Sequence, residues 1–170
     1  MIEVRELINT MLYDLNEMYA RKHSDEEFIN GINIVLRYIN LALINAESYH
    51  ITKEVTLKPK NGKTTLPSDF AKFRNFEDYD GPYTFMKDTL RITGDNVVMR
   101  YLYIIPAVES IEDEIDLPYF IFDMITRYVE GMMQGNLSSD VVGQMVANEI
   151  SKLTQSETYG PIERPMPFYV

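Results

Sequence analysis

The stretch that most constrains the fold runs from residue 25 to residue 48, where apolar side chains fall at almost every angle around a helix. Ser24 and Glu27 form a capping-box pattern that predicts where this helix begins. A helix that is apolar on nearly all sides must be covered, either by its own domain or by a second chain. The sequence therefore predicts that segment 25–48 lies at the centre of a core or at an interface.

Three other segments carry the single apolar stripe of an amphipathic helix. Apolar residues at three- and four-residue steps predict helices over about 2–22, 117–135 and 139–156. Pro118 suits the first turn of the third helix of the chain, and Gly135-Asn136 predicts its end. The acid-rich stretch from 109 to 116 is expected to be an exposed loop before that helix.

Between the second and third helices the pattern changes to strands. Residues 51–58 alternate, and Asn61-Gly62 predicts a type I′ hairpin turn that returns the chain through 64–66. Pro67-Ser68-Asp69-Phe70 is expected to break the strand and open one helical turn. Further strands are predicted over 83–86, 89–93 and 97–105. The last of these is apolar on both faces, so both of its sides should be covered.

Together these elements predict an α+β, mainly α fold: a four-helix bundle with a small antiparallel β subdomain inserted at about 51–106. The bundle and the insertion form one domain, 1–158, followed by an extended C-terminal arm, 159–170. Three prolines in the last ten residues disfavour helix there. The arm either folds back on its own domain or docks on another protein. The residues expected to make that docking contact are Tyr159, Pro161, Ile162, Pro165, Met166, Pro167, Phe168 and Tyr169.

Composition excludes several classes of function. The chain has no Cys and two His, which rules out disulfides and thiolate zinc sites and leaves little room for a His-based metal site. No membrane helix and no signal peptide are expected, so the protein should be made in a cytoplasm. A net charge of −10 disfavours sequence-specific DNA binding, because phosphates repel an acidic protein.

The charge is unevenly spread along the chain. Residues 51–108 carry a net charge of +2, whereas the flanks 1–50 and 109–170 carry −4 and −8. This pattern indicates either a solvated surface or copies that associate with basic middle against acidic flank. Lys58, Lys60 and Lys63 are candidates for contact with DNA or a neighbouring subunit, although such lysines also keep hairpins soluble.

No catalytic constellation stands out. His23 and His50 lie at helix ends, where a histidine needs no catalytic duty, and phosphate-binding loops are absent from the sequence. Glu112 and Glu114 could form a carboxylate pair for glycoside cleavage. Their acidic surroundings, which include Asp116, could also hold a hard cation, but they lack the pattern of a calcium loop. We therefore predict no catalytic residue, no cofactor and no bound metal.

The order of elements, and two soft motifs within it, resemble a known family. The motifs are Leu66-Pro67-Ser68-Asp69-Phe70, before the strands, and Asp113-Glu114-Ile115-Asp116-Leu117-Pro118, before a helix with Tyr128-Val129-Glu130. Over nearly its whole length, the chain resembles the head-to-tail adaptor (connector) proteins of tailed bacteriophages, especially short-tailed ones. The β insertion is larger than in the minimal four-helix members, which leaves open the surface that faces the tail.

The resemblance implies a structural protein of the virion without enzymatic activity. It would form a homo-oligomeric ring, commonly of twelve copies, that joins the portal protein to the tail and extends the DNA channel. DNA would pass without sequence-specific binding, and the C-terminal segment would reach the portal. Two alternatives stay open: a small phage enzyme that cleaves peptidoglycan with a carboxylate pair, and a partner-binding domain with no role in the virion.

Overall fold

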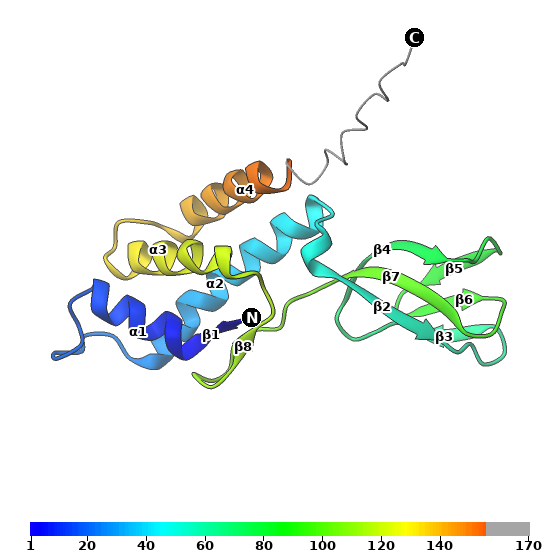
Figure 1. Cartoon of the computed structure of the whole chain (residues 1–170), viewed down its shortest axis with the longest axis horizontal. Helices are drawn as coiled ribbons and strands as arrows, with labels where there is room; N and C mark the ends of the chain where they lie inside the picture. The colour runs from blue at the N-terminus through cyan, green and yellow to red at the C-terminus, as the bar shows by residue number, and fades with distance from the viewer. Residues whose placement is uncertain (156–170) are drawn as a thin grey trace, which may run out of the picture.

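The computed structural model describes residues 1–155, which form two parts joined end to end (Figure 1). The helical body comprises residues 1–51 and 104–155, and the β lobe comprises residues 52–103. The chain enters the lobe after the short 3-10 helix η1 (Tyr49–Ile51) and leaves it through an extended segment beside α2 (Asp25–Asn45).

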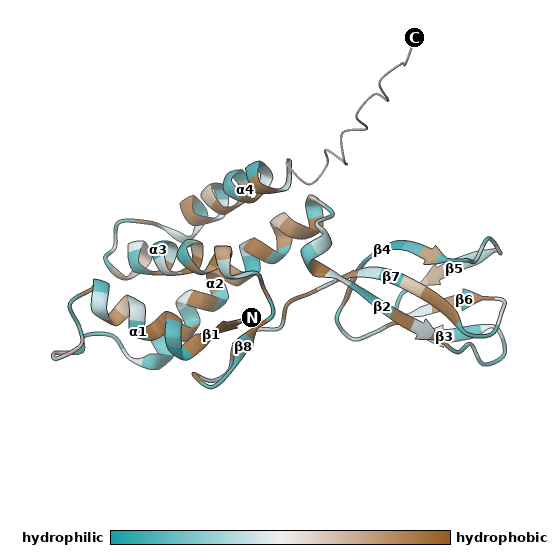
Figure 2. Ribbon diagram, in the orientation of Figure 1, coloured by the Kyte–Doolittle hydropathy of each residue, from teal (hydrophilic) through white to brown (hydrophobic). Residues whose placement is uncertain are grey.

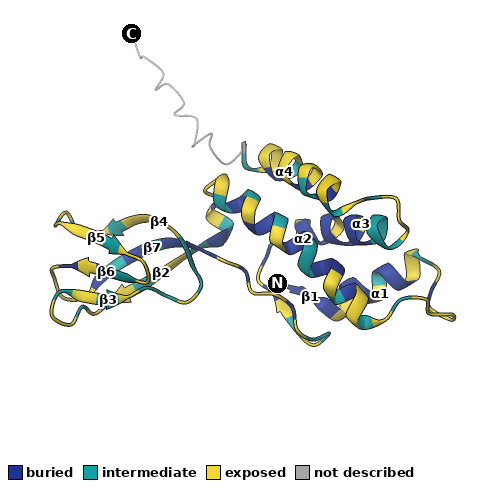
Figure 3. Ribbon diagram, turned by 180° about the vertical axis from the view of Figure 1, so that it is seen from behind, coloured by how far each residue is buried: buried dark blue, intermediate teal, exposed yellow. Residues whose placement is uncertain are grey.

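α2 is the central helix of the body. It packs against α3 (Phe122–Met133) and α4 (Ser139–Gln155), and α3 also packs against α1 (Val4–Asp14). The inward faces of these helices are buried and apolar (Figures 2 and 3). Among residues 1–155, α2 is the single helix long and apolar enough to span a bilayer by length and composition, a test that buried core helices also pass. Packing in the body accounts for part of the hydrophobicity of α2, since 39% of this apolar stretch is buried.

The predicted four-helix bundle with one β insertion is wrong. The described residues contain four α-helices and three small antiparallel sheets with eight strands, and helix makes up 43% and strand 24% of them. The third sheet pairs two body strands, β1 (Ile2–Glu3) and β8 (Glu114–Ile115). This pairing places Ile115 in the core within a stretch expected to be an exposed loop. The fold is therefore a mixed α+β arrangement.

The first helix is much shorter than the predicted 2–22. α1 ends at Asp14 because Asn16 adopts a left-handed conformation (φ 57°), which Asn tolerates. The Glu17 N–H then donates to the Leu12 carbonyl oxygen over 2.7 Å and closes the end of the helix. The apolar side chain of Met18 continues the helical spacing in the sequence, but it is 56% exposed. Periodicity alone cannot detect such a cap.

The β lobe consists of two three-stranded antiparallel sheets, in the orders β2-β7-β4 and β3-β6-β5. Aromatic rings meet between the sheets: Phe70 of β4 stacks on Phe85 of β5 with ring centroids 5.9 Å apart. The strands are β2 (Thr52–Leu57), β3 (Lys63–Thr65), β4 (Phe70–Glu77), β5 (Tyr83–Met86), β6 (Thr89–Ile92) and β7 (Val97–Tyr103).

The predicted turn forms, but the predicted hairpin does not. Asn61 and Gly62 both have positive φ, and the Lys60 N–H donates to the Lys63 carbonyl oxygen over 2.8 Å. The flanking strands then diverge, because β2 pairs with β7 and β3 pairs with β6. The expected helical turn at 67–70 is also wrong, since a tight turn there leads directly into β4.

The expectation that β7 is covered on both sides holds over part of its length. Met99 and Tyr101 are buried on one face. On the other face Leu102, next to the body, is buried, whereas Val98 and Arg100 are partly exposed. Arg100 forms ion pairs with Glu54 and Glu77 of the strands on either side, so the outer end of that face is polar.

Candidate functional site

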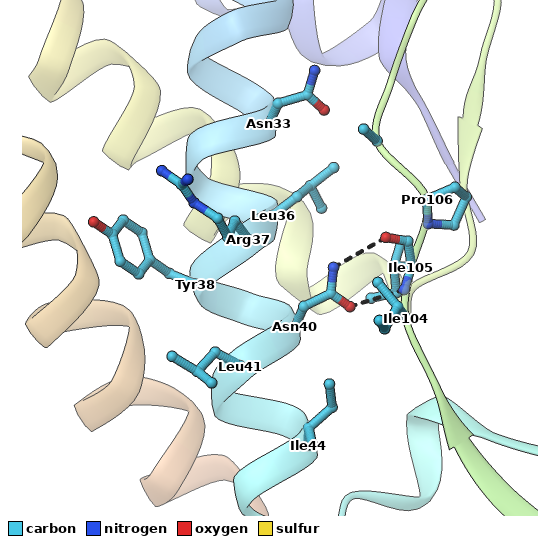
Figure 4. A pocket seen from close by; sticks show the side chains of 11 residues that line it. Asn33, Leu36, Arg37, Tyr38, Asn40, Leu41, Ile44, Ile104, Ile105 and Pro106 are labelled. Atoms are coloured by element: carbon cyan, nitrogen blue, oxygen red, sulfur yellow. Dashed lines mark hydrogen bonds between the residues drawn. The ribbon is translucent and has the colours of Figure 1, made fainter. Parts of the chain in front are cut away.

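An open, mainly apolar groove lies between α2 and the segment that returns from the β lobe (Figure 4). Its volume is about 530 Å³, within the range of ligand and peptide sites. The residues that line it are Asn33, Leu36, Arg37, Tyr38, Asn40, Leu41, Ile44, Ile104, Ile105, Pro106 and Ala107.

Two asparagines of α2 hold the far wall of this groove in place. The Asn40 side chain donates to the Ile105 carbonyl oxygen over 3.0 Å and accepts from the Ile105 N–H over 2.9 Å. Asn33 pairs in the same way with Val108, with both distances 2.8 Å. Because seven residues make almost two helical turns, both side chains lie on one face of α2. The extended segment is thus fastened to the helix at two points.

The groove leaves apolar surface open to solvent. Leu41 is 57% exposed and Ile104 is 46% exposed, and they lie on opposite sides of the groove. Arg37 is exposed at its rim and forms no ion pair with any residue of 1–155, while its guanidinium lies 5.9 Å from the centre of the Tyr38 ring. An apolar hollow with one unpaired cation is typical of a protein-docking surface.

A polar cluster fixes the β lobe to the body beside the groove. The Tyr103 hydroxyl donates to Asp116 Oδ2 over 3.0 Å, and Lys53 Nζ lies 3.8 Å from the centre of the Tyr103 ring. Lys53 Nζ and the Tyr101 hydroxyl both donate to Asp69, over 3.0 and 2.9 Å. Burial, with the hydrogen bond to Asp69, raises the pKa of Tyr101 to about 12, so this hydroxyl stays a donor at neutral pH.

The predicted contact lysines lie at the end of the lobe far from the body. Lys58, Lys60 and Lys63 are exposed around the Asn61-Gly62 turn, and none of them forms an ion pair within residues 1–155. The predicted partner-binding residues from Tyr159 to Tyr169 lie outside the described residues.

The acids proposed for catalysis or cation binding do not form an enclosed site. Glu112 forms an ion pair with Arg5, and both side chains are more than half exposed. Glu114 is exposed on β8. Asp113 accepts hydrogen bonds from two backbone N–H groups of the preceding turn, which lower its pKa. Within residues 1–155, no group of three or more His, Asp or Glu side chains is placed to hold a metal ion.

Both histidines make structural contacts. His23 Nδ1 lies 2.8 Å from Glu17 Oε1, and the buried Glu17 carboxylate also accepts from the N–H groups of Lys22 and His23. Burial alone would raise the pKa of Glu17, but these hydrogen bonds outweigh it and lower the pKa. The His50 ring meets the edge of Phe120, with ring centroids 5.4 Å apart, where η1 contacts the 3-10 helix η2 (Tyr119–Ile121).

Comparison with known proteins gives no match for this chain, either among models of protein families or among curated proteins.

The groove itself was not predicted from the sequence. The available signal was a pair of asparagines seven residues apart on an otherwise apolar helix, Asn33 and Asn40, where a buried amide must find partners. The partner segment 105–108 is remote in the sequence and carries no polar motif. Only the long-range packing of the lobe exit against α2 identifies it.

Proposed function

We propose that this protein is a structural adaptor of a tailed-phage virion, which assembles as a ring between the portal protein and the tail. The observation that carries the proposal is the groove between α2 and segment 104–107, which residues 1–155 leave open. Burying Leu41 and Ile104 against another chain would remove apolar surface from water. Each Å² buried would stabilise the association by about 25 cal/mol. The element order that resembles phage adaptors agrees with this role.

The ring follows from the kind of contact that such a surface makes. A groove on one side of a chain receives a different surface of the next copy, and such heterologous contacts close into rings when the rotation is right. The net charge of −10 suits a wall along which DNA slides, because binding DNA requires cations that neutralise its phosphates. Residues 159–170 are the proposed contact with the portal at the head–tail junction.

The test is the mass of the purified chain by light scattering, alone and mixed with a purified portal ring. At physiological ionic strength, where salt screens charge contacts between copies, we expect a monomer alone and a large ring only in the mixture. The variant Leu41→Asp should stay folded, because this side chain is mostly exposed, but should reduce ring formation at least tenfold. The matched control is Val141→Asp on α4, which is 43% exposed and does not line the groove.

Two results would contradict the proposal. A mixture in which the chain stays monomeric would exclude assembly on a portal. Equal ring formation by Leu41→Asp and Val141→Asp would show that the groove is not the subunit contact.

A further inference from the structure

Two of the sheets within residues 1–155 carry a cross-strand pair of like charge on their surface. In the β3-β6 ladder Lys63 lies directly opposite Arg91, and in the β1-β8 ladder Glu3 lies directly opposite Glu114. All four side chains are exposed, and none forms an ion pair within residues 1–155. Like charges directly opposite each other destabilise a ladder. An oppositely charged surface that docks beside either pair would therefore relieve its repulsion.

The basic pair belongs to a continuous outer face of the lobe, which we call the basic face. Paired residues of a sheet share a side, so Lys63, Arg91 and Thr84 form one row across β3-β6-β5. The next row ends in Met86, which is 45% exposed. Lys60 lies at the adjoining turn. The basic face thus combines positive charge with an apolar side chain.

The acidic pair borders a hollow on the outer side of α1, which we call the acidic hollow. Its volume is about 460 Å³, and Glu3, Glu6 and Arg5 line it at one end, where an ion pair with Glu112 offsets the charge of Arg5. Tyr13 and Met18 line the other end and are 73% and 56% exposed. The acidic hollow thus offers negative charge beside exposed apolar surface, which complements the basic face in both respects.

We propose that the basic face of one copy docks on the acidic hollow of the next copy. The proposal rests on the ring-forming function proposed above and names a contact between its subunits. A second copy fits better than a nucleic acid, because a phosphate backbone would leave the exposed Met86 without an apolar partner. The contact is heterologous: in addition to the groove contact proposed above, each copy offers its basic face to one neighbour and its acidic hollow to the other.

Charge reversal on the full chain tests the proposal. One variant carries Lys63→Glu and Arg91→Glu, and the other carries Glu3→Lys and Glu114→Lys. Reversal keeps the repulsion within each pair, so thermal unfolding should change little. Each variant alone presents two surfaces of the same sign and should associate at least tenfold more weakly than the wild type in sedimentation at low salt. An equimolar mixture of the two variants should recover the wild-type association.

The control variant carries Lys22→Glu and Lys152→Glu, which change the net charge as much as reversal of Lys63 and Arg91 does, at exposed sites outside both surfaces. It should associate like the wild type, and salt should weaken both. The proposal is overturned if the wild type does not associate at low salt, if either reversed variant associates normally, or if the mixture does not recover. Reversal of Lys63 and Arg91 that weakens binding to duplex DNA but not self-association would instead make the basic face a nucleic-acid contact.

These outcomes separate this contact from the adaptor function. If both charge-reversed variants form rings on a portal as the wild type does, the adaptor function would be supported and the charge contact excluded. If self-association depends on salt and on the charges of the two surfaces, but no ring assembles on a portal, the contact would be supported and the adaptor function excluded.

Discussion

Glu130 of α3 is held in an unfavourable setting. One of its carboxylate oxygens is buried and has no hydrogen-bond partner in the described part of the chain. Burial, together with the nearby charge of Asp14 at the end of α1, raises the pKa of Glu130 to about 7. The folded state therefore keeps a proton that the unfolded chain releases above its ordinary pKa of about 4.5. Stability should fall as the pH rises from about 4.5 to about 7 and stay lower above that.

Replacement of Glu130 by Gln removes the charge and keeps the shape. We expect Glu130→Gln to stabilise the protein by about 1 kcal/mol at pH 8 and to have little effect at pH 4.5, because the native carboxyl is then protonated. Urea unfolding at the two pH values measures the difference. Glu149→Gln is a control of opposite sign. The Glu149 carboxylate accepts hydrogen bonds from Tyr128 and Arg127, so this variant should be less stable than the wild type at pH 8. A Glu130→Gln effect that is equal at both pH values would contradict the argument.

At the scale of elements, the stability of the groove depends on two side-chain amides of α2. Asn40→Ala leaves the N–H and carbonyl of Ile105 without their partner in a buried position and should cost about 3 kcal/mol. Asn33→Ala removes an equivalent pair of hydrogen bonds in a more exposed position and should cost about 1 kcal/mol. Denaturant unfolding gives both values, and amide hydrogen exchange at Ile105 reports the local opening. Equal costs would mean that burial does not set the strength of this contact.

Some elements of this fold can be predicted from the sequence, whereas the pairing between elements cannot. The strands β5, β6 and β7 begin where the alternation and the turn residues place them, because those signals are local. Strand pairing is not local, so the Asn61-Gly62 turn was predicted correctly while its two strands were assigned to one hairpin. The hydrogen bonds of Asn33 and Asn40 join residues that are 65 to 75 positions apart in the sequence. No local sequence pattern predicts such a contact.

At the scale of the whole molecule, the buried apolar residues within 1–155 form one core cluster that extends from the body into the lobe. We therefore predict that deletion of residues 159–170 leaves the thermal unfolding transition within about 2 °C of the full chain, since a change below about 0.5 kcal/mol shifts Tm by no more than this at 170 residues. The same deletion should abolish attachment to a portal ring, measured by co-sedimentation. A truncated chain that binds the portal with unchanged affinity would exclude this segment as the contact.

The way in which the lobe is fastened determines how the molecule carries load. The return segment 105–108 runs along α2, where Asn33 and Asn40 bind it side-on at two places. These two side chains form four hydrogen bonds with the segment. A force that pulls the lobe along the segment would load all four bonds at the same time, in shear, and would not break them one after another. Tension applied at the tip of the lobe would thus be passed to α2, the longest helix within residues 1–155, before the body began to open.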